Sequence, residues 1–113
     1  MLKKKKRLTT KDFNGVFRES RVLHSKYLTL RYSRVTGTAP FLGSIVVSKK
    51  IANSAVLRNK FRRIGYIFFE RISNTLKQNT ACIFFLKKDA MTLSEVDLSS
   101  EMRILLEKAG LVA

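Results

Sequence analysis

Cysteine and histidine are almost absent from this chain of 113 residues, which has one of each. A single cysteine, Cys82, cannot form an internal disulfide, and with only His24 beside it the chain cannot supply the ligands of a zinc site. No apolar run approaches the ~18–20 residues that cross a membrane. These shortages exclude a disulfide-stabilised protein, a zinc protein and a membrane-spanning one, and they predict a reducing, cytoplasmic location.

Carboxylates are also scarce, and they are distributed unevenly. The chain has 8 Asp and Glu against 23 Lys and Arg, which gives a formal net charge of +15. Residues 20–69 contain ten Lys and Arg but no Asp or Glu, whereas the two signs balance in residues 70–113. An excess confined in this way favours a phosphate-binding face over a generally basic domain. An anionic membrane is a weaker candidate, because the basic helices lack a broad exposed apolar face.

The side chains of an autonomous enzyme site are missing too. A hydrolase or nuclease needs a positioned base, a nucleophile, or clustered carboxylates that hold a metal ion. His24 has no obvious carboxylate partner and is expected on the surface, whereas Cys82 lies in an apolar strand and is expected in the core. Half of the carboxylates fall near the first turns of predicted helices, where capping explains them. We therefore expect no catalytic residue and no metal ligand in this chain.

Apolar residues make up 45% of the chain, enough for a core, and the length predicts one domain over residues 1–113. Residues 1–7 are a basic arm without the apolar stretch of a signal peptide, so we expect them to be solvated. A capping box then starts a predicted helix over residues 9–20. Phe13 and Phe17 belong to the apolar stripe of this helix.

Four strands are predicted from alternating or continuous apolar patterns. They cover a short segment at residues 21–23 and longer segments at residues 27–35, 41–48 and 80–86. Leu28, Leu30 and Tyr32 alternate with polar residues, which indicates a strand with one buried face. The segment at residues 80–86 is almost entirely apolar and is therefore expected at the centre of the sheet.

Two further helices are predicted over residues 55–75 and 94–109, with Ser54 and Ser94 as their N-caps. On a helical wheel, the basic side of the first of these lies opposite its apolar side, which should pack on the sheet. The complete order α-β-β-β-α-β-α predicts an α+β single-domain sandwich. The strand–helix–strand unit at residues 41–86 indicates a parallel pair of strands, and the general rule makes its crossover right-handed.

The segment at residues 47–63, which reads VSKKIANSAVLRNKFRR, resembles the signature of the bacterial ribonuclease P protein family. That signature is a strand ending in Ser-Lys-Lys, a short loop, and a helix that begins with Arg-Asn-Lys or Arg-Asn-Arg. The resemblance extends to the first and last predicted helices. It departs from the family pattern in a loop one residue longer and at Gly65 and Tyr66. The resemblance implies a ribosomal protein S5 domain 2-like fold with a left-handed crossover, contrary to the general rule.

If the resemblance holds, the chain is the protein subunit of a ribonuclease P. One copy of the chain is expected in the enzyme, in the cytoplasm and without a membrane partner. The chain then binds the catalytic RNA and precursor tRNA and assists removal of the 5′ leader. The reaction uses Mg²⁺, which is held mainly by the RNA subunit and the substrate. The residues that the resemblance assigns to the catalytic RNA are Lys49, Lys50, Asn53, Arg58, Asn59, Lys60, Arg62 and Arg63. Those it assigns to the leader, in a cleft between the first helix and the sheet, are Phe13, Phe17 and Tyr32.

Both assignments have a physical basis. Guanidinium groups match phosphate oxygens, and aromatic faces stack on unpaired bases with little sequence preference. For Phe13 and Phe17, ordinary core packing is the competing interpretation, and for the basic residues it is a solvated helix face. The rival function is a non-enzymatic RNA-binding protein, such as a small ribosomal protein or an RNA chaperone. A nuclease that acts alone is disfavoured by the missing catalytic groups.

Overall fold

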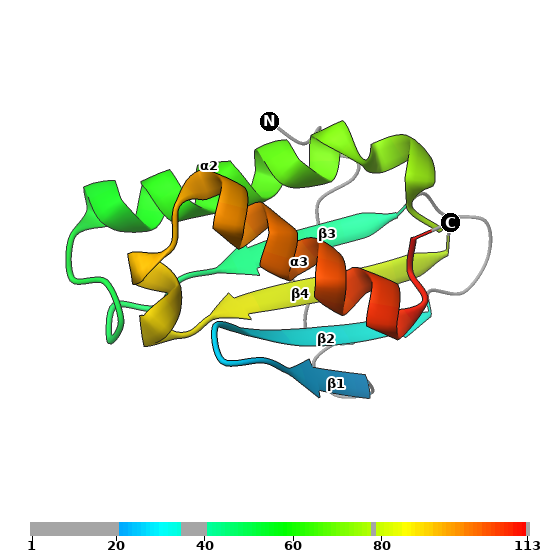
Figure 1. Cartoon of the computed structure of the whole chain (residues 1–113), viewed down its shortest axis with the longest axis horizontal. Helices are drawn as coiled ribbons and strands as arrows, with labels where there is room; N and C mark the ends of the chain where they lie inside the picture. Colours follow the sequence, from blue (N-terminus) through cyan, green and yellow to red (C-terminus); the bar gives the residue numbers. More distant parts are fainter. Residues whose placement is uncertain (1–20, 35–40, 78, 113) are drawn as a thin grey trace.

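The computed structural model describes residues 21–34, 41–77 and 79–112 (Figure 1). Its principal elements, in chain order, are β1 (Arg21–His24), β2 (Leu28–Arg34), β3 (Leu42–Val46), α2 (Ala55–Arg71), β4 (Thr80–Leu86) and α3 (Glu95–Ala109). Short 3₁₀ helices at Ser73–Thr75 and Lys88–Thr92 precede β4 and α3. All four predicted strands and both predicted later helices are confirmed. The basic arm at residues 1–7 and the predicted helix at residues 9–20 lie outside the described residues.

The strands form one sheet in the order β1-β2-β4-β3. β2 is antiparallel to both β1 and β4, whereas β3 is parallel to β4. The predicted parallel pair is therefore confirmed, and so is the central place of the apolar strand β4. On β4, Cys82 and Phe84 belong to the main core, whereas Ala81 and Ile83 belong to a smaller buried cluster. Both faces of β4 are thus buried, as its unbroken apolar run requires.

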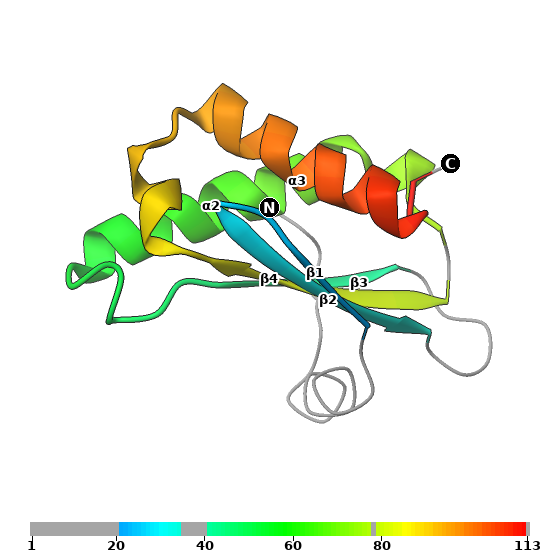
Figure 2. The ribbon, with the colours of Figure 1, turned by 60° about the horizontal axis from the view of Figure 1, so that its bottom comes forward.

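The crossover from β3 through α2 to β4 is left-handed, so the general expectation of a right-handed connection is wrong here. Both helices lie on one side of the sheet (Figure 2). In Figure 1 the helices lie in front of the sheet, both parallel strands run from right to left, and β3 lies above β4. When this view is turned so that the strands point upward, β4 lies to the left of β3, which makes the connection left-handed. A right-handed connection would move α2 to the opposite face, where the smaller cluster lies. Packing of α2 on the larger core therefore overrides the general preference.

Helix α2 is held to the sheet by a broad apolar side. Ser54 caps its start, because the Ser54 hydroxyl accepts a hydrogen bond from the Leu57 amide at 3.3 Å. The buried residues of the helix are Phe61, Ile64, Gly65, Phe68 and Phe69. The helix ends at Arg71 rather than at residue 75, because Ile72 leaves helical geometry and a 3₁₀ turn follows. The predicted opposition of a basic and an apolar side is confirmed.

Gly65 and Tyr66, where the chain departs from the family pattern within α2, both contact edge strand β3. A Cβ atom on Gly65 would lie 2.7 Å from two side-chain carbons of Ile45, so the helix approaches β3 as closely as it does only because residue 65 is glycine. The Tyr66 hydroxyl lies 3.4 Å from the Ile45 amide nitrogen and accepts its hydrogen bond. This bond satisfies an amide that an edge strand would otherwise present to solvent.

We expect Gly65→Ala to lower the free energy of unfolding by about 1–2 kcal/mol, even though alanine favours a helix. The added methyl group would overlap Ile45, and α2 or β3 would have to move. Urea denaturation measures the loss. The matched test is the same change in an Ile45→Ala background, where the clash is absent and Gly65→Ala should be neutral or stabilising. Equal losses in both backgrounds would contradict this role of Gly65.

Helix α3 has the caps that the sequence predicts. The Ser94 hydroxyl accepts a hydrogen bond from the Asp97 amide at 3.1 Å, and Gly110 ends the helix in the left-handed conformation, with φ at 73°. Its buried side comprises Leu98, Met102, Leu105 and Leu106. α3 contacts β1 and β2, whereas α2 contacts β3, so the two helices together cover the sheet.

Candidate nucleic-acid interface

The loop between β3 and α2 lies at one end of the sheet (Figure 1) and contains the exposed residues Lys49 and Lys50. The amides of Ile51 and Ala52 both donate hydrogen bonds to the Ser48 carbonyl, at 3.3 and 3.2 Å, which closes a tight turn. Ala52 is buried and anchors this turn in the core, whereas Lys49 and Lys50 are exposed. The two lysines therefore stand on a folded turn whose backbone is held at its base.

Arg58 fastens this loop to the first turn of α2. One guanidinium nitrogen, Nη1, donates to the Ala52 carbonyl at 2.8 Å and to the Asn53 carbonyl at 2.9 Å. The residue was predicted as a direct RNA contact, and the structure shows that its guanidinium also bonds the loop backbone. The sequence does not predict the bonds between Arg58 and the loop backbone, because nothing in the local pattern identifies carbonyl groups as partners of an arginine five or six residues away.

The next turn of α2 presents further polar groups. Asn59, Lys60 and Arg63 are exposed, and Arg62 is partly exposed. The Arg62 guanidinium donates a hydrogen bond to the side-chain oxygen of Asn59, three residues earlier on the same helix face. This bond orients the arginine and leaves the amide nitrogen of Asn59 as a donor for a phosphate or sugar oxygen.

All eight residues predicted to contact catalytic RNA lie on this loop and the first turns of α2. We call them the loop–α2 surface, which comprises Lys49, Lys50, Asn53, Arg58, Asn59, Lys60, Arg62 and Arg63. The first turn of α2 has no acidic residue, in contrast to α3, whose first turn has Glu95 and Asp97. The positive end of the α2 dipole therefore adds to the side-chain charge instead of being neutralised. No ion pair between two described residues involves this surface.

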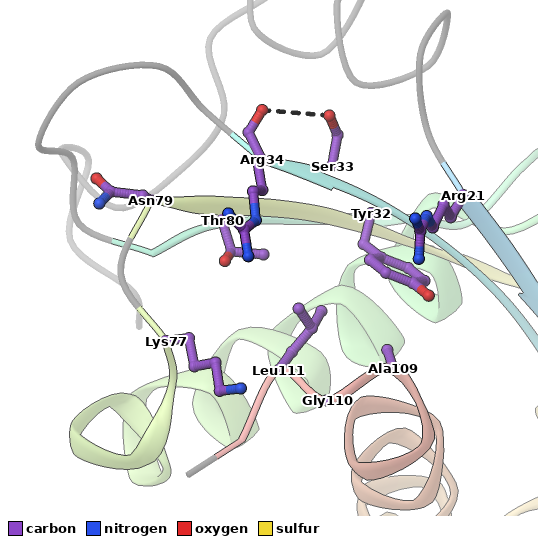
Figure 3. Close-up of a pocket in the computed structure, with 10 residues that line it drawn as sticks. All are labelled: Arg21, Tyr32, Ser33, Arg34, Lys77, Asn79, Thr80, Ala109, Gly110 and Leu111. Atoms are coloured by element: carbon purple, nitrogen blue, oxygen red, sulfur yellow. Dashed lines mark hydrogen bonds between the residues drawn. The ribbon is translucent and has the colours of Figure 1, made fainter.

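Of the three predicted leader contacts, the structure describes only Tyr32. Phe13 and Phe17 lie outside the described residues. Tyr32 is half-buried on β2, and its side chain packs against the main core on the face that the helices cover. It lies directly opposite Arg21 on β1 and Cys82 on β4. Tyr32 thus occupies a place separate from the loop–α2 surface, beside a pocket that the sequence did not indicate (Figure 3).

The two most reactive side chains are placed as predicted. Cys82 is fully buried, and this burial raises the pKa of its thiol well above the ordinary value, so the nucleophilic thiolate is disfavoured. His24 is exposed, with Nδ1 3.2 Å from the Thr29 hydroxyl oxygen. Among residues 21–34, 41–77 and 79–112, no three His, Cys, Asp or Glu side chains are grouped as metal ligands. Within the same ranges, neither α-helix is long and apolar enough to span a bilayer.

We expect Arg58→Lys to loosen the loop while preserving the charge, because an ammonium group cannot reproduce the paired carbonyl contacts of the guanidinium with the same geometry. Backbone amide exchange at Ile51 and Ala52 should accelerate by about tenfold, equivalent to ~1.4 kcal/mol of lost local stability. Lys60→Arg, which changes a neighbouring exposed cation, is the control and should leave both amides unaffected. Unchanged exchange in Arg58→Lys would show that the turn is held without Arg58.

Comparisons with known proteins identify the fold and the family of this chain. A family model described as Ribonuclease P matches residues 2–110. The ribonuclease P protein of Staphylococcus aureus has a TM-score of 0.86 and 19% identity, over 96% of this chain and 98% of that chain. The ribonuclease P protein from Thermotoga maritima has a TM-score of 0.80 and 20% identity, over 90% and 96% respectively. A search of curated proteins yields no match. The solved structures establish the fold, and because the family model spans almost the whole sequence, this chain belongs to the ribonuclease P protein family.

Proposed function

We propose that this ribonuclease P protein binds the catalytic RNA of the enzyme through the loop–α2 surface and thereby assists removal of the 5′ leader from precursor tRNA. In this proposal one copy of the chain, in the cytoplasm, joins one RNA. The observation that carries the proposal is the gathering of six cations within residues 49–63, a stretch that contains no Asp or Glu. Such a surface is neutralised best by closely spaced phosphates.

The parts of the loop–α2 surface have different tasks in this proposal. Lys49 and Lys50 supply mobile point charges, whereas the planar guanidinium groups of Arg62 and Arg63 match pairs of phosphate oxygens. Arg58 holds the loop in position as well as adding charge. Neutralised phosphates repel one another less, so the RNA reaches its active shape at a lower concentration of divalent ions.

The leader of precursor tRNA is proposed to contact Phe13, Phe17 and Tyr32 through stacking of unpaired bases on their rings. Stacking of this kind contributes ~1–3 kcal/mol per base and accepts any base, which suits an enzyme with many precursor substrates. Mg²⁺ held mainly by the RNA and substrate would supply the Lewis acid and activated water for phosphodiester hydrolysis. The protein then acts through binding and positioning.

Reconstitution tests the proposal. The full chain, the catalytic RNA of the same organism and a precursor tRNA are combined at low Mg²⁺, and the rate of cleavage at the mature 5′ end is measured. We expect a rate at least about tenfold above that of RNA alone, equivalent to ~1.4 kcal/mol of the activation barrier. No acceleration would overturn the proposal and would favour the rival, an RNA-binding protein without an enzymatic assembly.

The proposed leader contact is tested by measuring the binding of precursor tRNA and of leaderless tRNA to the reconstituted enzyme. Phe17→Ala should weaken binding of precursor tRNA by about fivefold or more, the lower end of a lost stacking contact, while binding of leaderless tRNA stays unchanged. Equal losses on both substrates would assign Phe17 to the core. The matched control is Val56→Ala on α2, whose side chain is 80% exposed and not assigned to either RNA.

A further inference from the structure

A pocket of about 730 Å³ lies at the end of the sheet opposite the loop–α2 surface (Figure 3). Its volume is in the range of sites that hold small organic ligands, roughly 300–1,000 Å³. The sheet supplies its floor through Arg21 of β1, Tyr32 and Arg34 of β2, and Thr80 of β4. Its wall is formed by Lys77 and by the chain that leaves α3, at Ala109, Gly110 and Leu111. The site thus joins segments that are far apart in the sequence.

The backbone holds the floor of this pocket in register. Arg21 pairs directly with Tyr32 across β1 and β2, and Arg34 pairs directly with Thr80 across β2 and β4. Tyr32 and Arg34 are two residues apart on one strand. These side chains therefore share one face of the sheet, at its end beside α3.

Backbone contacts also hold the wall of the pocket in place. The Lys77 amide donates a hydrogen bond to the Leu111 carbonyl at 3.0 Å, and Leu76 forms an antiparallel bridge with Val112. Gly110 turns the chain in the left-handed conformation, so that Leu111 returns to donate to the Leu106 carbonyl at 3.0 Å. The pocket is therefore formed before any ligand arrives.

The described residues that line the pocket include three cations and no carboxylate. Arg21, Arg34 and Lys77 supply three positive charges, and the side chains of Arg34 and Lys77 point into the space between sheet and wall (Figure 3). Glu107, in the last turn of α3, is engaged elsewhere, with its carboxylate 3.0 Å from the Arg103 side chain. Near the end of α3, the carbonyls of Glu107 and Leu106 accept hydrogen bonds from the amides of Gly110 and Leu111, so these two carbonyls do not require cations as partners.

The remaining lining residues add an aromatic ring and hydrogen-bonding groups. Tyr32 presents its ring beside Arg21, and Thr80 adds a hydroxyl group, whereas the side chains of Ser33 and Asn79 point away from the space (Figure 3). Cations suit a phosphate, a ring suits a flat base, and a hydroxyl group suits a sugar. We propose that this pocket binds a nucleoside monophosphate unit, with its phosphate on Arg21, Arg34 and Lys77 and its base against Tyr32.

This site uses none of the residues of the loop–α2 surface, but it shares Tyr32 with the proposed leader contacts, so its RNA-bound form rests on the proposed function. Two sources could deliver the same chemistry, namely a free mononucleotide or one unit of a single-stranded RNA. The test therefore uses three probes with the full chain, which are inorganic phosphate, AMP and a pentanucleotide of adenosine. Binding is followed through the amide resonances of Thr80, Gly110 and Leu111, and the amide of Ile51 reports the loop–α2 surface separately.

We expect AMP to shift the pocket resonances in a saturable manner and to bind more tightly than inorganic phosphate. The double change Arg21→Gln, Arg34→Gln should weaken AMP binding by about tenfold or more, because charge-assisted hydrogen bonds are lost. Lys88→Gln with Lys108→Gln removes the same charge from exposed positions outside the pocket and should change AMP binding by less than about twofold. Tyr32→Leu should weaken AMP binding by about fivefold or more and leave phosphate binding unchanged, whereas Tyr32→Phe keeps the ring and the affinity.

The outcomes separate the alternatives. Tighter binding of the pentanucleotide than of AMP at the pocket resonances identifies RNA as the source, and equal binding identifies a free nucleotide. The proposal is overturned if AMP does not shift these resonances, if phosphate binds as tightly as AMP, or if the Lys88 and Lys108 control loses as much affinity. Acceleration of cleavage by the wild-type chain and the Phe17→Ala binding test do not use the pocket resonances, so a failure of the pocket proposal is distinguished from a failure of the proposed function.

Discussion

Arg62→Gln combined with Arg63→Gln is expected to weaken binding of catalytic RNA by about 100-fold at moderate salt. Each guanidinium that contacts phosphate contributes at least ~1.4 kcal/mol through charge-assisted hydrogen bonds, and each such energy corresponds to about a tenfold change in affinity. Neither residue belongs to the buried side of α2, so the fold should persist. Affinity is measured by filter binding or fluorescence anisotropy over a series of salt concentrations.

The salt dependence is the more specific readout of this variant. Each lost phosphate contact lowers the slope of log affinity against log salt by about one, so the double variant should lose about two. Lys88→Gln with Lys108→Gln is the charge-matched control and should retain the wild-type slope. If both double variants lose equal affinity and equal slope, net charge rather than the loop–α2 surface governs RNA binding, and the proposed interface is wrong.

Phe69→Ala is expected to have the largest effect on stability, a loss of about 3–5 kcal/mol. Phe69 is fully buried, and its ring lies 5.5 Å from the ring of Phe41, 6.2 Å from that of Phe68 and 5.8 Å from that of Phe84. It therefore joins α2 to both parallel strands. Because a domain of this size is stable by only about 5–15 kcal/mol, this single cavity would remove a large part of the margin.

Thermal and urea unfolding, followed by circular dichroism, measure this effect. Val56→Ala on the same helix is the control, since that side chain is 80% exposed and its loss should change stability by less than about 0.5 kcal/mol. Sulfate should raise the melting temperature of both proteins, because it relieves the repulsion that a net charge of +15 creates. A loss below about 1 kcal/mol in Phe69→Ala would show that the core repacks around the gap.

Much of this fold follows from local patterns in the sequence. The caps at Ser54 and Ser94, the strand at residues 80–86 and the basic side of α2 each depend on neighbours within a few residues, and all four are confirmed. The eight residues of the loop–α2 surface are also close in the sequence, within residues 49–63. The resemblance assigned them to the catalytic RNA, and helical periodicity placed the basic residues of α2 opposite its apolar side.

Other features require contacts between distant segments, and no local pattern encodes those. The left-handed crossover depends on which face of the sheet offers the larger core, and the need for glycine at residue 65 depends on Ile45, twenty positions earlier. The cationic pocket combines Arg21, Arg34 and Lys77, which look like unrelated surface charges until the sheet and the turn after α3 assemble them. Periodicity reports the side on which a residue lies, whereas packing alone reports what lies against it.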